Sequence, residues 1–424
     1  MIFRIFFIFL ILCFQQSTFA AFPSAPSSRE GNILNKWQRD SIQPFILLQE
    51  KITNPEEAMS NSVKVVTVIT EYKDSVSLVN IATAFSVLGR ISSENPTIRK
   101  DLKESGKFTN LISVLENRID KFETREFVNA LVGLVKIGYY NEDLFDRLAE
   151  KCLELSITDP QHLANTAWAF AKVDHYSKRL FDALKEESIR QISGFNPQNL
   201  ANTAWAFASI DHYSESLFRA LKKESIRQLD DFNSQDLANT AWAFAIFNKK
   251  DTVKKIIDHV IKNQDVSRLP LKTKVQLIQA ASLFKNEYRE LIEQVGSLVE
   301  THPSGLQKEI FALLVQIEKG ISFSEEEEVI ANCIVDIAIK AHKIAIEVDG
   351  PSHYARNSSE KPHLLGRNRL KENILEAQGW KLIRIPYFVW DSKTTESDHK
   401  EYLSSLLKKN GFTFPEKRKR SDSK

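Results

Sequence analysis

Apolar and small residues recur in the middle of the chain as a nine-residue pattern whose copies begin at residues 163, 200 and 237, a spacing of 37 residues. In the first copy, Leu163, Ala167 and Phe170 stand at positions i, i+4 and i+7, which lie on one face of an α-helix. A second apolar set follows after a short break at 174–176. Each repeat is therefore predicted to be a helical hairpin. Because one hairpin cannot bury its own apolar faces, the hairpins should stack as a solenoid.

The linkers between hairpins contain residues that begin helices. Asn196 followed by Pro197 is a helix start, and Asn233 occupies the same place one repeat later. Weaker copies of the nine-residue pattern stand at 79–85, 128–134 and 277–284. We therefore expect the repeats to occupy 61–320, after one or two helices over 32–60 that lead into them.

The pattern changes after the repeats. Short β-branched runs predict strands, and a longer amphipathic stretch between them predicts a helix. The predicted strands are 333–339, 343–349 and 380–386, the helix is 363–378, and a closing helix over 398–409 follows with Asp398 as its cap. The acidic run 324–328 is interpreted as the start of a helix or a linker. The fold class is mostly α: an α-solenoid followed by a small α+β domain.

Composition and charge narrow the possible functions. The chain has 424 residues, of which 42% are hydrophobic and 26% charged, as in folded proteins of two or more domains. The net charge is +2, and residues 160–248 contain nine Lys or Arg against ten Asp or Glu. Binding to nucleic acid would therefore depend on local patches and stacking. The same balance also leaves open a protein-binding scaffold.

The N-terminus predicts targeting. Residues 1–21 have a short apolar run after Arg4, as in a signal peptide, and the Ser- and Pro-rich stretch 22–31 has no acid before Glu30. The junction resembles the bipartite leader of complex plastids, which predicts the plastid stroma. The endomembrane system, secretion and the mitochondrion are the alternatives. We expect no transmembrane helix in the mature chain, and no disulfide, since Cys152 and Cys333 fall in different predicted domains.

Three acids in the C-terminal domain are candidates for chemistry. Glu347 and Asp349 are two residues apart on a predicted strand, so their carboxylates should project from the same face, and the neighbouring strand could place Asp336 alongside. Three converging carboxylates could hold Mg²⁺ and activate water against a phosphate. The alternative is that these acids hydrogen-bond the adjacent turn.

The runs 344–354, 367–375 and 379–387 resemble the RAP domain over 333–392, followed by the closing helix and a basic tail over 393–424. The repeats resemble octotricopeptide-type repeats. The resemblance implies an organellar RNA-binding protein that controls processing, stability, splicing or translation. Its implied partners are single-stranded organellar RNA and other RNA-processing proteins.

RAP domains in turn resemble the PD-(D/E)xK endonuclease-like fold. In that fold Asp336 and Glu347 match the metal-binding acids, and Asp349 replaces the motif lysine. The acid expected on the following helix is missing, since its slots hold Arg367 and Lys371. The resemblance therefore favours a silent RNA-binding module without a cofactor over a Mg²⁺-dependent RNA endonuclease.

Residues that differ between repeats are candidates for reading bases, and basic residues are candidates for contacting phosphates. The alternative for the basic residues is that they form a solvated helix face. The alternative for His353 is that its side chain hydrogen-bonds its own turn. The predicted RNA-binding residues are His162, Asn199, Asp236, Lys172, His353, Arg367, Arg369 and Lys371.

Other residues are identical in every copy. Either the repeated asparagines read one base per repeat, or they form a ladder of hydrogen bonds to the backbone of the adjacent repeat, with the tryptophans as packing. The ladder is favoured, because a base code needs variation between repeats. These residues are Asn165, Asn202, Asn239, Trp168, Trp205 and Trp242.

Overall fold

The computed structural model describes residues 42–48, 55–284, 287–293, 302–317, 320–330, 333–358 and 362–411. Two compact units divide the chain after Tyr139. The predicted signal peptide, leader and basic tail lie outside the described residues. Within the residues described, no helix combines the length and apolar character needed to cross a bilayer.

The first unit is entirely helical among its described residues. Its helices are α3 (Gln43–Leu48), α4 (Pro55–Glu71), α5 (Leu78–Glu94), α6 (Pro96–Glu104), α7 (Gly106–Glu116) and α8 (Thr124–Ile137). The weaker copies of the repeat pattern lie in α5 and α8, which pack closely together. Their contact is backbone to backbone, because a Cβ on Gly133 would lie 2.3 Å from the carbonyl oxygen of Phe85.

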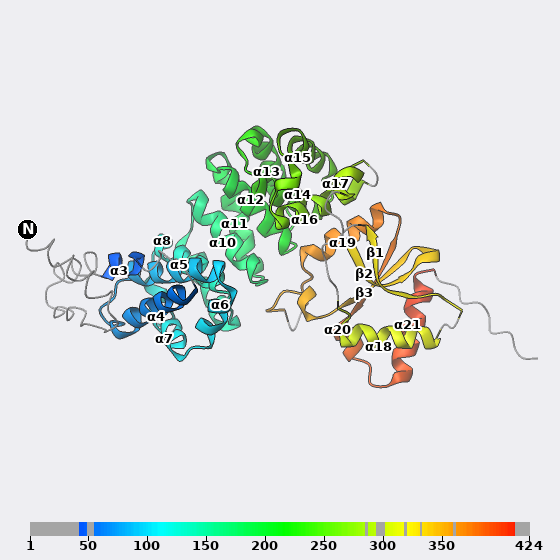
Figure 1. Ribbon diagram of the computed structural model, residues 1–424, viewed down its shortest axis with the longest axis horizontal. Coiled ribbons are helices and arrows are strands. Elements are labelled where there is room, and N and C mark those ends of the chain that lie inside the picture. Colours follow the sequence, from blue (N-terminus) through cyan, green and yellow to red (C-terminus); the bar gives the residue numbers. More distant parts are fainter. Residues whose placement is uncertain are drawn as a thin grey trace, which may run out of the picture. The chain divides into compact units, whose positions relative to one another are not determined.

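The second unit begins with α9 (Glu142–Leu155) and contains the clear repeats (Figure 1). The first helices of the hairpins, called A helices below, are α10 (Pro160–Lys172), α12 (Pro197–Ser209), α14 (Ser234–Ile246) and α16 (Leu271–Ala281). Their partners are α11 (Lys178–Gln191), α13 (Glu215–Arg227) and α15 (Lys250–Asn263), and α17 (Arg289–Glu293) follows. Successive A helices pack against one another, which confirms the stacked hairpins.

The predicted helix starts are also confirmed. Asn196 and Asn233 are the N-caps of α12 and α14, and each side chain accepts a hydrogen bond from the third helical N–H. Aromatic side chains pack between the second helix of one hairpin and the A helix of the next. Phe181 of α11 meets Phe207 of α12 edge to face, with ring centroids 5.2 Å apart.

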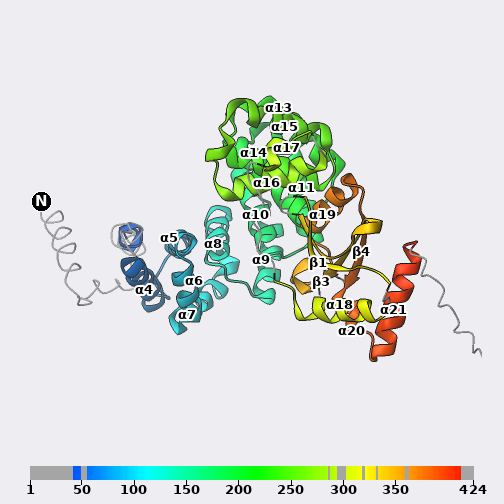
Figure 2. The ribbon, with the colours of Figure 1, turned by 45° about the vertical axis from the view of Figure 1, so that its right-hand side comes forward.

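The C-terminal domain has a four-stranded sheet in the order β1-β2-β3-β4, namely Ser324–Ile330, Cys333–Ile339, Ile344–Asp349 and Lys381–Pro386. The first three strands are antiparallel, and β4 runs parallel to β3 after the crossover helix α19 (Gly366–Ala377). One face packs a core against α18 (Gly305–Ile317) and α21 (Glu396–Lys409). On the other face α19 lies between the sheet and the repeats (Figures 1 and 2). The mostly α fold with a small α+β domain is confirmed.

Two local predictions are wrong. The acidic run 324–328 is not a helix or a linker but part of β1, because pairing with β2 at the edge of the sheet outweighs the helix propensity of glutamate. The closing helix begins earlier than predicted. Its N-cap is Thr395, and Asp398 completes a capping box from the third helical position.

Candidate nucleic-acid interface

Helix α19 lies across the C-terminal ends of the A helices. Asn373 donates hydrogen bonds to the carbonyl oxygens of Ala245 (3.1 Å) and Ile246 (2.9 Å), at the end of α14. Gln378 reaches the carbonyl of Ser282 (2.9 Å), which follows α16. Carbonyls at a helix end lack partners within the helix, so these side chains cap successive repeats. The α+β domain is therefore docked on the array through its crossover helix.

Ion pairs and ring stacking extend this contact. Arg369 holds Asp211 through two hydrogen bonds (2.7 and 2.8 Å), and Arg367 lies 3.4 Å from Asp174. Both aspartates stand at the turns between paired helices. The ring of His363 stacks on Tyr176 with centroids 3.7 Å apart. Arg367 and Arg369, predicted to contact phosphate, are thus held by carboxylates of the repeats.

The three candidate acids come together on the α19 side of the sheet. Alternate residues of β3 belong to the opposite core, so Glu347 and Asp349 share the face towards α19. Asp336 on β2 accepts a hydrogen bond from the backbone of Val348 (2.7 Å), and its own N–H lies 3.3 Å from Glu347 Oε1. The predicted juxtaposition is present, while the catalytic role stays a prediction.

Cations of the protein already pair with two of these acids. The ammonium of Lys371 on α19 pairs with Glu347, and Arg384 donates to Asp349 (2.7 Å). Burial raises the pKa of Glu347 to about 7, and Lys371 only partly opposes this shift. Burial also acts to lower the pKa of Lys371, but the charges of Glu347 and Asp336 outweigh it and raise that pKa.

The same geometry does not fit Mg²⁺. Among the residues described, no group of three or more His, Cys, Asp or Glu side chains could hold a metal ion. Glu347 and Asp349 present oxygens to cations of the protein instead of to a common point. No step through a metal is derived from Asp336, Glu347 and Asp349.

The side chain of His353 contacts α19 and the end of β3, which differs from the expected hydrogen bond to its own turn. Its Nδ1 lies 2.7 Å from Asn368 Oδ1 and 3.0 Å from Asp349 Oδ1. Burial acts to lower the pKa of His353, but the hydrogen bond and charge of Asp349 outweigh it and raise that pKa. The imidazole ties the turn after β3 to α19, since Asn368 is a buried residue of that helix.

A cavity of about 290 Å³ lies where the A helices meet α19 and β2. Trp242 and Gln279 line it from the repeats, and Asp336, Arg367 and Lys371 line it from the α+β domain. The indole N–H of Trp242 donates to Gln279 Oε1 (2.9 Å). An aromatic wall, an amide and two cations here match what a nucleotide offers, namely a flat base, hydrogen-bonding edges and a phosphate, while the carboxylates of Glu326 and Asp336 line the same cavity.

Trp242, which lines this cavity, is in contact with the tryptophan of the preceding repeat. Trp205 and Trp242 are stacked, with ring centroids 6.4 Å apart and an interplanar angle of 26°. Trp168 and Trp205 are half-buried, so each keeps an exposed edge. We call the surface of Asn165, Asn202, Asn239, Trp168, Trp205 and Trp242 the Asn-Trp face.

The preferred asparagine ladder does not form among the described residues. Asn239 accepts a hydrogen bond from Gln235 of its own helix (2.9 Å), and Asn165 and Asn202 make no side-chain hydrogen bond. The physical reason is position: all three are half-buried, while small neighbours such as Ala164 and Ala201 fill the contact between repeats. Bonds between repeats here come from other side chains: Trp242 donates to Gln279, which occupies the asparagine position of α16, and Gln235 donates to Gln276 of α16 (2.9 Å).

The variable helix-start residues are placed differently from the Asn-Trp face. Asn199 and Asp236 are each only 6% exposed, and burial raises the pKa of Asp236. Only His162 of this set is half-buried. Their placement between repeats does not support base reading by Asn199 and Asp236.

Lys172 is exposed at the end of α10. Partial burial lowers the pKa of Lys272 on α16, and the nearby charge of Lys172 adds to this shift. Two lysines from A helices far apart in sequence therefore lie within electrostatic range. Such a like-charge pair attracts an anion.

Sequence reasoning did not identify Gln279, Asn373 and Gln378 as interface residues. For Gln279 a signal existed, because it stands in the asparagine position of a weaker repeat copy. Asn373 and Gln378 had no such signal, since their partners are backbone carbonyls far away in the chain.

Two family models match the chain. One, described as RAP domain, matches residues 346–406, and the other, described as RNA-editing substrate-binding complex 6 protein, matches residues 50–296. A chloroplastic RAP domain-containing protein of Oryza sativa subsp. japonica is 33% identical over 104 residues. The matched segment is 24% of this chain and only 15% of the rice protein.

These matches confirm the RAP resemblance. The octotricopeptide identity of the repeats and the likeness to the PD-(D/E)xK fold stay predictions. Since the second model covers more than half of the chain, the protein belongs to the RNA-editing substrate-binding complex 6 protein family and carries a C-terminal RAP domain.

Proposed function

We propose that this protein binds single-stranded RNA along the Asn-Trp face and holds it against α19 at the 290 Å³ cavity. The observation that carries the proposal is the stacked pair of Trp205 and Trp242 on helices that also present the amides of Asn165 and Asn202, which make no hydrogen bond within the described part of the chain. In a hydrogen-bonded ladder those amides would be bonded to the backbone of the adjacent repeat and would not be available to a ligand. Amides beside exposed aromatic edges are instead available to bases.

Each part of the surface has a chemical role in the proposal. The half-buried indoles of Trp168 and Trp205 offer stacking planes, each worth about 1–3 kcal/mol per base, whereas Trp242 is only 9% exposed and supports Trp205 by stacking against it. The asparagine amides offer a donor and an acceptor to a base edge. At the cavity, Arg367 and Lys371 supply positive charge for phosphate, although Arg367 also pairs with Asp174 of the repeats and Lys371 with Glu347 of β3. The near-neutral charge of the repeats makes stacking the larger contribution.

Binding of this kind acts without chemistry by the protein. A bound segment is protected from exonucleases, or a ribosome site is freed, so the role proposed is post-transcriptional control of organellar transcripts. The family description, which names RNA editing, and the chloroplastic relative support an RNA partner and a plastid location. Other RNA-processing proteins are proposed as partners.

Crosslinking of the full chain to total organellar RNA in the presence of Mg²⁺ tests the proposal. We expect discrete footprints on intact RNA that are lost when Trp168, Trp205 and Trp242 are all replaced by alanine. RNA ends produced by the wild type but not by Glu347→Gln would instead establish an endonuclease. If the wild type enriches no RNA, the binding proposal is overturned and a protein-binding scaffold, exported or not, becomes the better description.

A further inference from the structure

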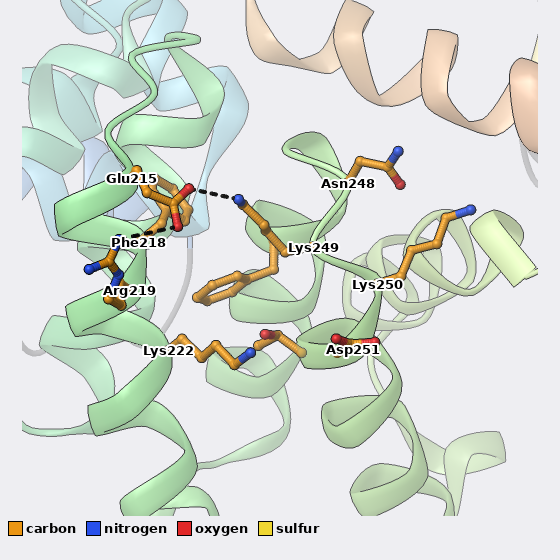
Figure 3. Close-up of a pocket in the computed structure, with 10 residues that line it drawn as sticks. Glu215, Phe218, Arg219, Lys222, Asn248, Lys249, Lys250 and Asp251 are labelled. Carbon is orange, nitrogen blue, oxygen red and sulfur yellow. Dashed lines mark hydrogen bonds and ion pairs between the residues drawn. The ribbon is translucent and has the colours of Figure 1, made fainter.

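A second, larger cavity of about 590 Å³ lies between α13 and the start of α15 (Figure 3). It is strongly charged, and no sequence motif pointed to it. Its basic lining residues are Arg219, Lys222, Lys249 and Lys250, and its acidic ones are Glu215 and Asp251.

Positive charge is in excess there. Glu215 accepts from Lys249 (2.9 Å) and lies 3.9 Å from Arg219, so this one carboxylate is shared by two cations (Figure 3). Within the described part of the chain, Lys222 and Lys250 have no ion pair. Two exposed ammonium groups therefore remain, against the single carboxylate of Asp251.

The start of α15 differs from the equivalent helix starts. The N-caps of α9, α11 and α13 are Asn141, Ser177 and Ser214, and each side chain accepts a hydrogen bond from the third helical N–H. In α15 the N-cap is Lys249, which makes no such bond. The N–H of Thr252 donates to the carbonyl of Lys249 (3.0 Å), whereas those of Lys250 and Asp251 have no backbone acceptor among the described residues. These two N–H groups are left for another acceptor, and the helix dipole favours a negative one.

Thr252 is the second, independent feature. It is the third residue of α15, where α11 and α13 have the buried leucines Leu180 and Leu217. Its side chain is 1% exposed and lines the cavity, yet its hydroxyl has no hydrogen-bond partner among the described residues. A buried hydroxyl without a partner is costly unless a ligand supplies the bond.

We propose that this cavity binds a phosphate group of the RNA backbone, between Lys222, Lys250, Thr252 and the first turn of α15. The inference rests on the proposed function. We infer an RNA phosphate and not a free anion because α14 and the turn that follows it line both cavities. Trp242 lines one cavity, and Asn248 in the turn lines the other. The helix rises about 6 Å from Trp242 to its last residue, Ile246, and Asn248 follows two residues later, a span that a few nucleotides cover.

The test compares two double variants of the full chain. Lys222→Ala/Lys250→Ala removes the two free ammonium groups, and Lys223→Ala/Lys255→Ala removes the same charge from exposed lysines of the same helices outside the cavity. Affinity for a random-sequence 20-nucleotide RNA is measured over a range of salt concentrations. We expect the slope of log K against log salt to fall by about 0.7 in the first variant, since the site holds one phosphate and each phosphate contact on a single strand contributes about 0.7. The control should retain the wild-type slope.

A slope unchanged in both variants, with wild-type binding intact, would overturn this inference and leave the proposed function standing. No binding of the RNA by the wild type would overturn both. Inorganic phosphate gives a separate measurement. If it raises the unfolding temperature of the wild type but not of Lys222→Ala/Lys250→Ala, while both bind RNA equally, the site is for a small anion and the RNA assignment is wrong.

Thr252→Val checks the site without changing charge. Valine has the same shape, so the fold should be kept or slightly stabilised when no anion is bound. RNA affinity should fall several-fold, and an unchanged affinity would remove Thr252 from the site.

Discussion

Gly366, at the start of α19, faces the end of α12 so closely that a Cβ on it would lie 1.8 Å from the carbonyl oxygen of Ala208. A methyl group cannot fit against a backbone atom at that distance. The RAP domain and the repeats are thus in direct contact at a position where a side chain of any size is excluded.

Gly366→Ala should therefore loosen the docked RAP domain. We expect a loss of about 1–3 kcal/mol in the free energy of unfolding, as for other overpacked sites, and faster hydrogen exchange in α19. Gly350→Ala is the control, since a Cβ there meets nothing within 4 Å. Equal exchange in the two variants would contradict tight docking at this point.

The pair of Lys371 and Glu347 gives a prediction about stability. Lys371→Met leaves a buried carboxylate without its cation and should cost about 3 kcal/mol near pH 8. The double variant Lys371→Met/Glu347→Gln removes both charges and should recover most of that loss. Denaturant unfolding of the two variants measures the difference, and an equally unstable double variant would show that the pair itself is not the cause.

The raised pKa of Glu347 predicts a pH dependence. An unfolded glutamate has a pKa of about 4.3, whereas that of folded Glu347 is about 7. The folded state holds this proton more tightly, so the stability it contributes is complete below about pH 4 and is lost as the pH rises towards 7 and above.

Between pH 5 and pH 8 the wild type should therefore lose about 2–3 kcal/mol more than Lys371→Met/Glu347→Gln. Carboxylates with lowered pKa values, such as Asp182, act in both proteins and cancel in the comparison. Parallel pH profiles of the two proteins would argue against the raised pKa.

The asparagines of the repeats should separate binding from folding. Asn202→Ala removes an amide that makes no hydrogen bond within the described structure, so the free energy of unfolding should change by less than about 0.5 kcal/mol, while RNA affinity falls. Asn373→Ala removes the side-chain donor to the carbonyls of Ala245 and Ile246, of which Ala245 keeps the N–H of Asn248, and should cost about 1 kcal/mol. If Asn202→Ala is the more destabilising, the asparagine has a structural role after all.

Stacking is tested at Trp205. Trp205→Ala should weaken RNA binding by about 1–3 kcal/mol, whereas Trp205→Phe keeps an aromatic plane and should retain most of the affinity. Both can be measured with the random-sequence RNA used above. Equal losses in the two variants would indicate that the indole N–H, not the ring plane, makes the contact.

The sequence by itself determined the elements that depend on local chemistry. The 37-residue period, the helix-starting asparagines and the strands of the C-terminal domain follow from periodicity and capping, which act between near neighbours. The shared face of Glu347 and Asp349 follows from the alternation of side chains along a strand. The strand at 324–328 could not be foreseen, since only pairing with β2 decides it.

Only the tertiary structure decided which side chains are available to a ligand. Arg367, Arg369 and Lys371 look alike in sequence, but each meets a different carboxylate, from α10's turn, α12's turn and β3. The repeated asparagines, expected to hydrogen-bond the backbone of the adjacent repeat, are half-buried, and among the described residues only Asn239 makes a side-chain hydrogen bond. The reason is that partners such as Asp211 for Arg369 lie more than 150 residues away in the chain, and no local pattern encodes contacts at that separation.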